Sequence, residues 1–257
     1  MPDLKTYLST LCEYAPLHIK EEWDNVGLMC GDEKSEIKGI IISLDLTLSV
    51  IDEAIENECN LIITHHPLIF GGIDVIDYNT PMGKKIKKLI KNDINVISMH
   101  TNLDKAKGGV NDTLCEKLGL SDIKNLTDED FSIGRAGVLE KETTLKDFVL
   151  SVKEKLGTKG IKYVGNDERK IKKVAVVSGS GSEFYMDAIK CGADVFITSE
   201  IKHHIAIDTL ERDFAIIDAG HFETENIITE KIKYYLSEKY DVKILTSQSY
   251  NELFKEV

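Results

Sequence analysis

Short apolar runs that end next to histidine or a carboxylic acid recur along this chain, and they constrain its fold more than any other feature. Three of these runs are Leu61–Ile63, Val96–Ile97 and Phe214–Ile217. Runs of this length and composition are typical of buried strands, and helix-like segments separate them. Strands that alternate with helices predict an α/β fold with largely parallel sheets. Because sites in such folds form beyond the carboxyl ends of the strands, the polar residues that follow the runs are expected to line one site.

The residues after the three runs are of the types that bind divalent metal ions. In chain order they are His65 and His66, His100 and Asp104, and His221 and Glu225. Imidazole and carboxylate groups without cysteine suit ions such as Zn, Fe, Mn or Co. The alternative interpretation is that these are ordinary polar residues at the start of loops. We favour a metal site because three such groups occur and contain four of the chain's seven histidines.

The spacing of these residues indicates more than one ion. Adjacent strand residues point to opposite faces, so His65 and His66 are expected to serve different ions. His221 and Glu225 are four residues apart and share one face if a helix forms there. A carboxylate can bridge two cations, and Asp104 and Glu225 are the candidates. Two ions about 3.5–4 Å apart can hold a substrate and activate a water molecule.

Other polar residues lie where they can assist such a site. Glu200 and His204 follow an apolar run at 194–198, and they are the candidates for proton transfer. Asp45 follows another apolar run and can hydrogen-bond a metal-binding histidine.

Two loops admit either a structural or a functional role. Trp23, the only tryptophan, is expected to anchor its loop by packing, and Asp24 and Asn25 can contact the site. The turn Ser178–Ser182 (SGSGS) separates a strand from a helix, where backbone N–H groups can bind an anion. It lacks the Gly-Lys-Ser/Thr ending of a P-loop, so a tight turn is the preferred interpretation. Ser180 is kept as a candidate substrate contact.

The composition excludes several classes of protein. The 257 residues have a net charge of −12 and a pI of about 5.1, which argues against general affinity for nucleic acid or an anionic membrane. No apolar run approaches the roughly 20 residues that span a bilayer, and no signal-peptide pattern is present. Five scattered cysteines fit free thiols in a reducing cytoplasm. The lysines at 84–91 are expected to form a solvated helix face.

Hydrophobic periodicity predicts the remaining elements. Helices are expected at 3–14, 48–57, 82–92, 109–118, 144–156, 182–191 and 225–239, and further strands at 37–44, 136–140, 162–164, 174–178, 194–198 and 242–245. The polar segment 121–135 is expected to be a connector. Segments 38–66 and 172–200 resemble each other weakly at an offset of 134 residues. We therefore expect two related α/β domains, 1–125 and 126–257, with segment 214–257 returning to the metal site.

Five motifs in a fixed order resemble those of the GTP cyclohydrolase I type 2-like proteins, also called the Nif-three-like family. They are Trp23–Leu28 (WDNVGL), Leu44–Thr47, Thr64–Pro67, His100–Asp104, and Gly220-His221 followed by Glu225. The resemblance implies a cofactor of two divalent ions (Zn, Fe or Mn) in the cleft between two α/β domains, with His65, His66, Asp104, His221 and Glu225 as ligands. It also implies a toroidal homohexamer. The short connector from Gly119 to Ala136 indicates the compact form of the family, without an inserted middle domain.

The resemblance implies a metal-dependent hydrolase that opens the imidazole ring of GTP and releases formate. Two alternatives stay open at this point. One is a two-metal hydrolase of another substrate, such as a phosphoester. The other is a metal-binding hexameric scaffold or regulator without catalytic activity.

Overall fold

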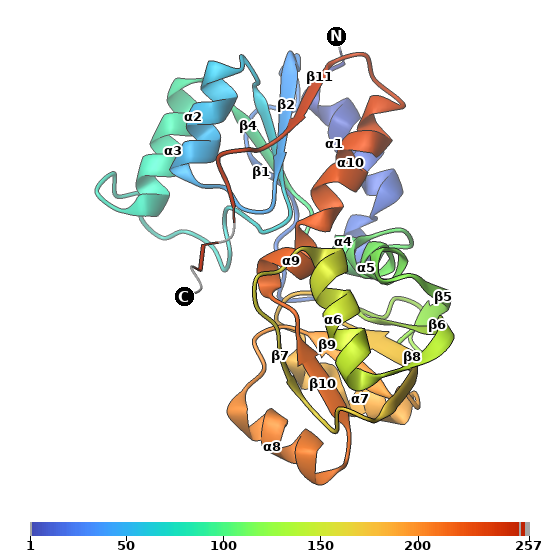
Figure 1. The fold of residues 1–257 in the computed structure, drawn as a ribbon. Coiled ribbons are helices and arrows are strands. Elements are labelled where there is room, and N and C mark those ends of the chain that lie inside the picture. The colour runs from blue at the N-terminus through green and yellow to red at the C-terminus, as the bar shows by residue number, and fades with distance from the viewer. Residues whose placement is uncertain (1, 252, 255–257) are drawn as a thin grey trace. The chain divides into compact units, whose positions relative to one another are not determined.

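The computed structural model describes residues 2–251, 253 and 254. They form two compact units, each with its own sheet (Figure 1). Unit 1 contains the chain up to Ala106 together with Ile228–Asn251, and unit 2 consists mainly of Lys107–Ile227. The mixed α/β architecture confirms the predicted fold class.

Unit 1 contains a sheet of five strands and five α-helices among the described residues. Its strands are β1 (Gly27–Cys30), β2 (Gly39–Ser43), β3 (Leu61–Thr64), β4 (Asn95–Ser98) and β11 (Lys243–Thr246), and its helices are α1 (Leu4–Tyr14), α2 (Leu48–Glu56), α3 (Pro81–Lys91), α4 (Thr101–Lys105) and α10 (Ile227–Ser237), with a 3-10 turn η1 (Leu17–Ile19). The strand order is β1-β4-β3-β2-β11, and only β1 is antiparallel to its neighbour.

Helices cover both faces of the unit 1 sheet, with α2 and α3 on one face and α1 and α10 on the other (Figure 1). Every residue of β2, β3 and β4 is therefore buried, which explains why these strands are continuous apolar runs. Ile41, Ile62 and Val96 belong to the core beneath α2 and α3. On the other face, the rings of Tyr14 and Tyr235 lie 4.6 Å apart and link α1 to α10.

Unit 2 contains a sheet of six strands and five α-helices within the described part of the chain. Its strands are β5 (Leu120–Asn125), β6 (Arg135–Thr144), β7 (Lys162–Val164), β8 (Lys170–Val176), β9 (Val195–Thr198) and β10 (Ala215–Asp218), and its helices are α5 (Val110–Leu118), α6 (Leu145–Leu156), α7 (Tyr185–Lys190), α8 (His203–Glu211) and α9 (His221–Glu225), with a 3-10 turn η2 (Ser182–Phe184). The strand order is β5-β6-β8-β9-β10-β7. The parallel pairs are β8–β9 and β9–β10, so parallel pairing is confined to the centre of this sheet.

Successive residues of β8 serve the two faces of the unit 2 sheet, as the pleat of a strand requires. Val174 and Val176 belong to the core beneath α5 and α6, whereas Ala175 belongs to the core beneath α7 and α8.

The two sheets repeat one arrangement, as the weak internal similarity predicted. Adding 134 to the bounds of β3 (61–64) gives those of β9 (195–198), and adding it to α2 (48–56) gives η2 with α7 (182–190). The order β1-β4-β3-β2 in unit 1 corresponds to β7-β10-β9-β8 in unit 2, with the outer strand antiparallel in both. The loops that follow β3 and β4 therefore correspond to those that follow β9 and β10.

Local signals set the helix boundaries. Thr47, Thr80 and Thr144 cap α2, α3 and α6, since each hydroxyl accepts a hydrogen bond from the backbone N–H three residues later, at 3.1–3.2 Å. Gly119 ends α5 in the left-handed conformation (φ 76°), which is common for glycine at this position of a helix.

Three expectations from the sequence need correction, and one helix was missed. The polar segment 121–135 was expected to be a connector, but most of the edge strand β5 lies within it. The helix expected at 225–239 is two helices, α9 and α10, and begins at His221. The short helix α4 was not expected. The units also divide the chain differently from 1–125 and 126–257, because β5 pairs with β6 whereas β11 pairs with β2.

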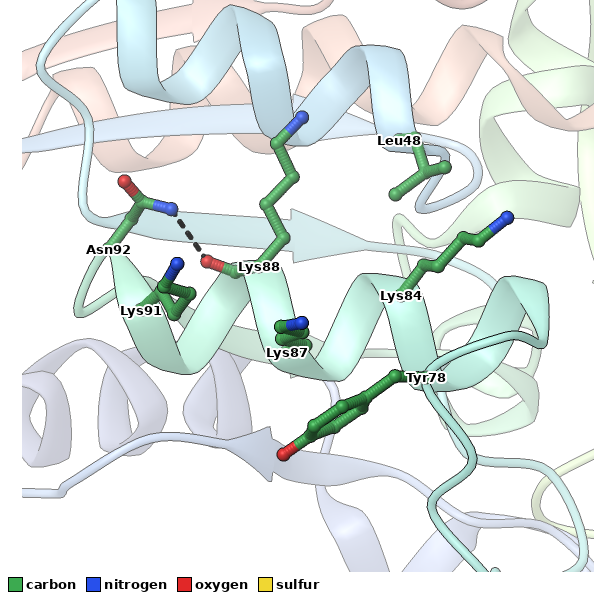
Figure 2. A pocket seen from close by; sticks show the side chains of 7 residues that line it. All are labelled: Leu48, Tyr78, Lys84, Lys87, Lys88, Lys91 and Asn92. Atoms are coloured by element: carbon green, nitrogen blue, oxygen red, sulfur yellow. Dashed lines mark hydrogen bonds between the residues drawn. The ribbon is translucent and has the colours of Figure 1, made fainter.

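The lysine-rich helix α3 has the solvated face that its spacing predicted. Its lysines border an open pocket (Figure 2), lined by Leu48, Tyr78, Lys84, Lys87, Lys88, Lys91 and Asn92. Lys87 Nζ lies 4.6 Å from the centre of the Tyr78 ring, and Lys88 pairs with Asp52. Ile86 and Leu89, on the opposite side of α3, are buried.

No helix in the described part of the chain combines the length and apolar character needed to cross a membrane.

Candidate metal centre

Three histidines of unit 1 lie together at the carboxyl ends of neighbouring strands. β3 ends at Thr64 and β4 ends at Ser98, and these two residues are paired in the parallel ladder. His65, His66 and His100 consequently lie at one edge of the sheet, and one ring nitrogen of each lies within 4.8 Å of those of the other two. Three imidazole nitrogens at this separation can ligate a divalent cation.

The Nδ1 atom of each of these imidazoles hydrogen-bonds an oxygen atom. The pairs are His65 with the carbonyl of Met99 at 2.9 Å, His66 with Asp45 Oδ1 at 3.0 Å, and His100 with Asp24 Oδ1 at 2.8 Å. Carbonyl and carboxylate oxygens accept hydrogen bonds, so Nδ1 carries the proton and Nε2 has the lone pair. Histidines that bind metals have this arrangement, in which an outer oxygen fixes the tautomer and the ring orientation.

Asp24 holds His100 firmly in place. One carboxylate oxygen bonds His100, and the other accepts from the Thr101 backbone N–H at 3.0 Å and from its hydroxyl at 2.5 Å. Burial raises the pKa of this carboxyl group, but the hydrogen bonds from His100 and Thr101 outweigh burial and lower the pKa to about 2. Asp24 is therefore ionised throughout the neutral range.

Asp104 adds a buried carboxylate to the three imidazoles. It lies on α4, and its Oδ1 atom is 3.6 Å from His65 Nε2. Two ligands of one tetrahedral zinc ion lie about 3.3 Å apart, given metal–ligand bonds of about 2.0–2.1 Å. His65 and Asp104 are therefore close enough to share an ion.

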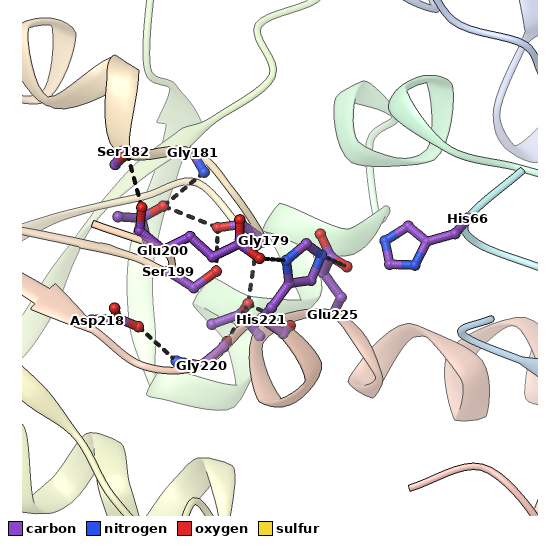
Figure 3. A network of polar contacts seen from close by, with 12 residues as sticks. His66, Gly179, Gly181, Ser182, Ser199, Glu200, Asp218, Gly220, His221 and Glu225 are labelled. Atoms are coloured by element: carbon purple, nitrogen blue, oxygen red, sulfur yellow. Dashed lines mark hydrogen bonds and ion pairs between the residues drawn. The ribbon is translucent and has the colours of Figure 1, made fainter. Parts of the chain in front are cut away.

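Unit 2 has a second donor set at the carboxyl ends of β9 and β10 (Figure 3). His221 and Glu225 are the first and last residues of α9, and His221 Nε2 lies 2.9 Å from Glu225 Oε2. His221 Nδ1 bonds Glu200 Oε1 at 2.7 Å. Burial raises the pKa of Glu200, but hydrogen bonds from His221 and Ser180 lower it below its usual value. The Nδ1 atom of this histidine thus bonds an outer oxygen, as do those of the unit 1 histidines.

The backbone of the Ser178–Ser182 turn supports this second set. The Gly179 N–H donates to Thr224 Oγ1 at 3.0 Å, and the Gly179 carbonyl accepts from the Ser199 hydroxyl at 2.6 Å. The Ser178 N–H donates to Asn111 Oδ1 at 2.8 Å. These amides already have partners inside unit 2, which favours the tight turn over an anion cradle.

Comparison with known proteins agrees with this fold. The family model described as Duf34/NIF3 (NGG1p interacting factor 3) matches residues 2–252. The chain belongs to the DUF34/NIF3 family. The chain is 41% identical over 258 residues to a "GTP cyclohydrolase 1 type 2 homolog" of Clostridium perfringens, with 98% of both chains covered. The protein of that name in Clostridium acetobutylicum is 42% identical over 227 residues, which cover 86% of this chain and 85% of that protein.

Several solved structures share the fold. The Staphylococcus aureus hypothetical protein SA1388 has a TM-score of 0.94 and 32% identity, and the match covers 100% of this chain and 99% of that one. A Bacillus cereus protein related to NIF3 has a TM-score of 0.94 and 27% identity, with the same coverage. Reduced HcgD from Methanocaldococcus jannaschii has a TM-score of 0.83 and 32% identity, covering 96% of this chain and 98% of that one.

One comparison also bears on the size of this NIF3 chain. The alignment with a Staphylococcus aureus relative runs over 346 positions, more than the 257 residues of this chain. That relative therefore has residues that this chain lacks, whereas the Clostridium perfringens protein aligns over 258. The chain is of the compact type, as the short connector predicted.

The other candidate residues differ in their surroundings. Asn25 is exposed and donates from Nδ2 to the Ile69 carbonyl at 2.8 Å. Ser180 is exposed and hydrogen-bonds Glu200. His204 is exposed in the first turn of α8, where Lys202 chiefly and His204 to a smaller degree lower the pKa of Glu183.

One residue has surroundings that differ from its predicted role, and one residue that supports the site was missed. Trp23 was expected to be packed, but 59% of its surface is exposed, because Asp24 rather than the indole anchors the loop. Thr224, which bonds Gly179, was not considered. The signal that could have found it is its place on the same turn as His221 and Glu225.

Replacing Gly179 by alanine is expected to disturb the second donor set. A Cβ atom at this position would lie 1.9 Å from Glu225 Oε1 and 3.2 Å from His221 Nε2, and φ is +60°. Gly192 is a matched control, since its φ is +76° but no atom lies within 4 Å of such a Cβ. Both variants lose about 1 kcal/mol from the backbone conformation alone, and Gly179→Ala should lose at least twice as much as Gly192→Ala in urea unfolding. Equal losses would contradict the contact.

Proposed function

We propose that this chain is a hydrolase that depends on two divalent metal ions and opens the imidazole ring of GTP with release of formate. The observation that supports it best is the repeated histidine arrangement. In both units, every histidine of the donor set bonds an oxygen through Nδ1, which is the arrangement that orients metal-binding histidines. The names of the Clostridium relatives suggest the substrate.

The residues present fit the metal ions that the family resemblance implies. We propose that five ligands hold two ions in one centre: His65, His66, Asp104, His221 and Glu225. His100 joins them as a sixth candidate, because it lies in the same cluster as His65 and His66. The donor set accepts Zn, Fe or Mn. When bound, such ions would act as Lewis acids on the substrate and lower the pKa of water.

The outer residues of the centre would have distinct tasks. Asp45, Asp24 and Glu200 would keep His66, His100 and His221 in the tautomer that directs Nε2 to the metal. Glu200 also has a backbone φ of +53°, which is uncommon for a residue other than glycine and is a form of strain found at functional sites.

The chemistry of ring opening requires proton transfers that this chain can supply. Water adds to C8 of the purine and the C8–N9 bond breaks, which leaves a formamide on N7. In this first step N7 and N9 each gain a proton. A second water molecule then breaks the C8–N7 bond and releases formate, and N7 gains a second proton. Glu200, whose pKa is lowered, is ionised near neutral pH and is the proposed proton acceptor. His204 is the proposed proton donor.

Formate release tests the proposed reaction. Protein loaded with Zn, Fe or Mn is expected to release formate from GTP, while chelator-treated protein and His65→Ala should not. His18→Ala is a matched control, because His18 is an exposed histidine outside the donor sets. If loaded protein yields no more formate than His65→Ala, the GTP reaction is wrong, and a hydrolase of another substrate or a scaffold takes its place.

We also propose the homohexamer that the family resemblance implies and the cytoplasmic location that the cysteines indicate. Light scattering is expected to give about six times the monomer mass of 28.8 kDa. A mass equal to one chain at every concentration would contradict the hexamer. The free cysteines fit a reducing compartment.

A further inference from the structure

Two exposed aromatic side chains lie beside the histidine cluster of unit 1. Trp23 and Phe70 each expose 59% of their surface. Their ring centres are 5.7 Å apart in an edge-to-face arrangement. Both rings also contact the His100 ring, at 6.1 Å for Trp23 and 6.4 Å for Phe70.

The backbone around these rings is held in place. The Glu21 N–H donates to Thr101 Oγ1 at 2.9 Å, and Asp24 bonds Thr101 and His100, so the residues on both sides of Trp23 are tied to the end of β4. Asn25 Nδ2 donates to the carbonyl of Ile69, next to Phe70. The exposure of the two rings is therefore a property of a fixed surface.

We propose that Trp23 and Phe70 form a stacking surface that binds the purine ring of GTP; this rests on the proposed function. For reaction, the C8 atom of the purine must lie about 3–3.5 Å from the attacking oxygen of water, and therefore close to the metal ligands. The His100 ring centre is 5.2 Å from that of His65 and 5.6 Å from that of His66. Only the His100 ring thus separates a base stacked on Trp23 or Phe70 from the donor nitrogens of His65 and His66.

The chemistry of these side chains suits a flat heteroaromatic ring. Base–aromatic stacking needs an uncovered ring face and no hydrogen-bonding pattern. A second copy of this chain could cover the same rings, since exposed aromatic residues also occur at protein interfaces. Contact of both rings with a histidine of the cluster favours the substrate, and the experiment distinguishes the two occupants.

The only tryptophan of the chain is itself the probe. GTP and guanosine are expected to change the fluorescence of Trp23, whereas inorganic triphosphate, which has the charge without the ring, should leave it unchanged. By calorimetry, Trp23→Ala should weaken GTP binding by about tenfold. Trp23→Phe should restore most of this loss, and Phe70→Leu should weaken binding although it retains an apolar side chain. Tyr234→Ala is the control, since Tyr234 is 65% exposed on α10.

The outcomes separate this inference from the proposed reaction. Ring-dependent fluorescence change and weakened binding in Trp23→Ala support stacking, even if no formate is released. Formate release with unchanged fluorescence and unchanged GTP affinity in Trp23→Ala overturns stacking and leaves the reaction standing. A smaller assembly mass in Trp23→Ala with unchanged GTP affinity overturns stacking in favour of a contact between copies. A complete lack of GTP binding by the metal-loaded protein also overturns stacking.

Discussion

Replacing Glu225 by glutamine is expected to abolish formate release and to lower bound metal well below the wild-type content. Glu225 is 5% exposed, and its Oε2 atom lies 2.9 Å from His221 Nε2. Glutamine has nearly the same size, so the fold should persist, but its neutral amide is a much weaker ligand than a carboxylate. Metal content measured by mass spectrometry, together with formate release, tests this expectation.

A graded series makes this prediction sharper. Glu200→Gln replaces the carboxylate that bonds His221 Nδ1 by a neutral amide and should reduce metal affinity or activity by about 10–100-fold, as for other outer carboxylates. Glu225→Gln should exceed that loss. Glu183→Gln is the matched control, because Glu183 is an exposed carboxylate of unit 2 that pairs with Lys202. Full metal retention in both Glu225→Gln and His66→Ala would contradict the ligand assignment.

The positions of the donor residues could be predicted from the sequence because local signals place them. His65 and His66 follow a strand whose four residues are all buried, and such a strand is visible as an apolar run. His221 follows β10 in the same way, and α9 begins at His221, so that Glu225 falls one turn later. The edge strand β5 was missed because its residues are mostly exposed and polar, so they lack the apolar signal of a buried strand.

Asp45 was expected to hydrogen-bond a metal-binding histidine, and it bonds His66. The other partners of the histidines could not be predicted, because they depend on strand order. Asp24 reaches His100 only because β1, which follows it, pairs antiparallel with β4. Glu200 reaches His221 because β9 and β10 are neighbours in the parallel sheet. From the sequence, Glu200 was a candidate for proton transfer. Its bond to His221 gives it a positioning role as well, which the graded series above measures.

Replacing Asp24 by asparagine is expected to destabilise the protein by about 2–4 kcal/mol at neutral pH. Asp24 is 5% exposed and accepts hydrogen bonds from His100, Thr101 and Asn25. The NH₂ group of asparagine is a hydrogen-bond donor, so it would face one of these N–H or O–H donors without an acceptor between them. Ionisation of the Asp24 carboxyl group alone contributes about 2 kcal/mol to the free energy of unfolding, since its pKa falls from 3.8 to about 2 and one pKa unit is worth about 1.4 kcal/mol.

The pH dependence of the Asp24→Asn effect follows from the direction of this shift. A carboxyl group with a lowered pKa in the folded state stabilises the fold fully above its unfolded pKa and stops doing so as the pH falls through its folded pKa. The difference in unfolding free energy between wild type and Asp24→Asn should therefore be constant above about pH 5 and shrink between about pH 4 and pH 2.

Urea unfolding of both metal-free proteins measures this difference. Metal must be absent because ligands that bind only the folded state add stability. Asp241→Asn is the control, since Asp241 is exposed. Equal unfolding midpoints for wild type and Asp24→Asn at pH 7 would show that the bonds to His100 and Thr101 do not hold this loop.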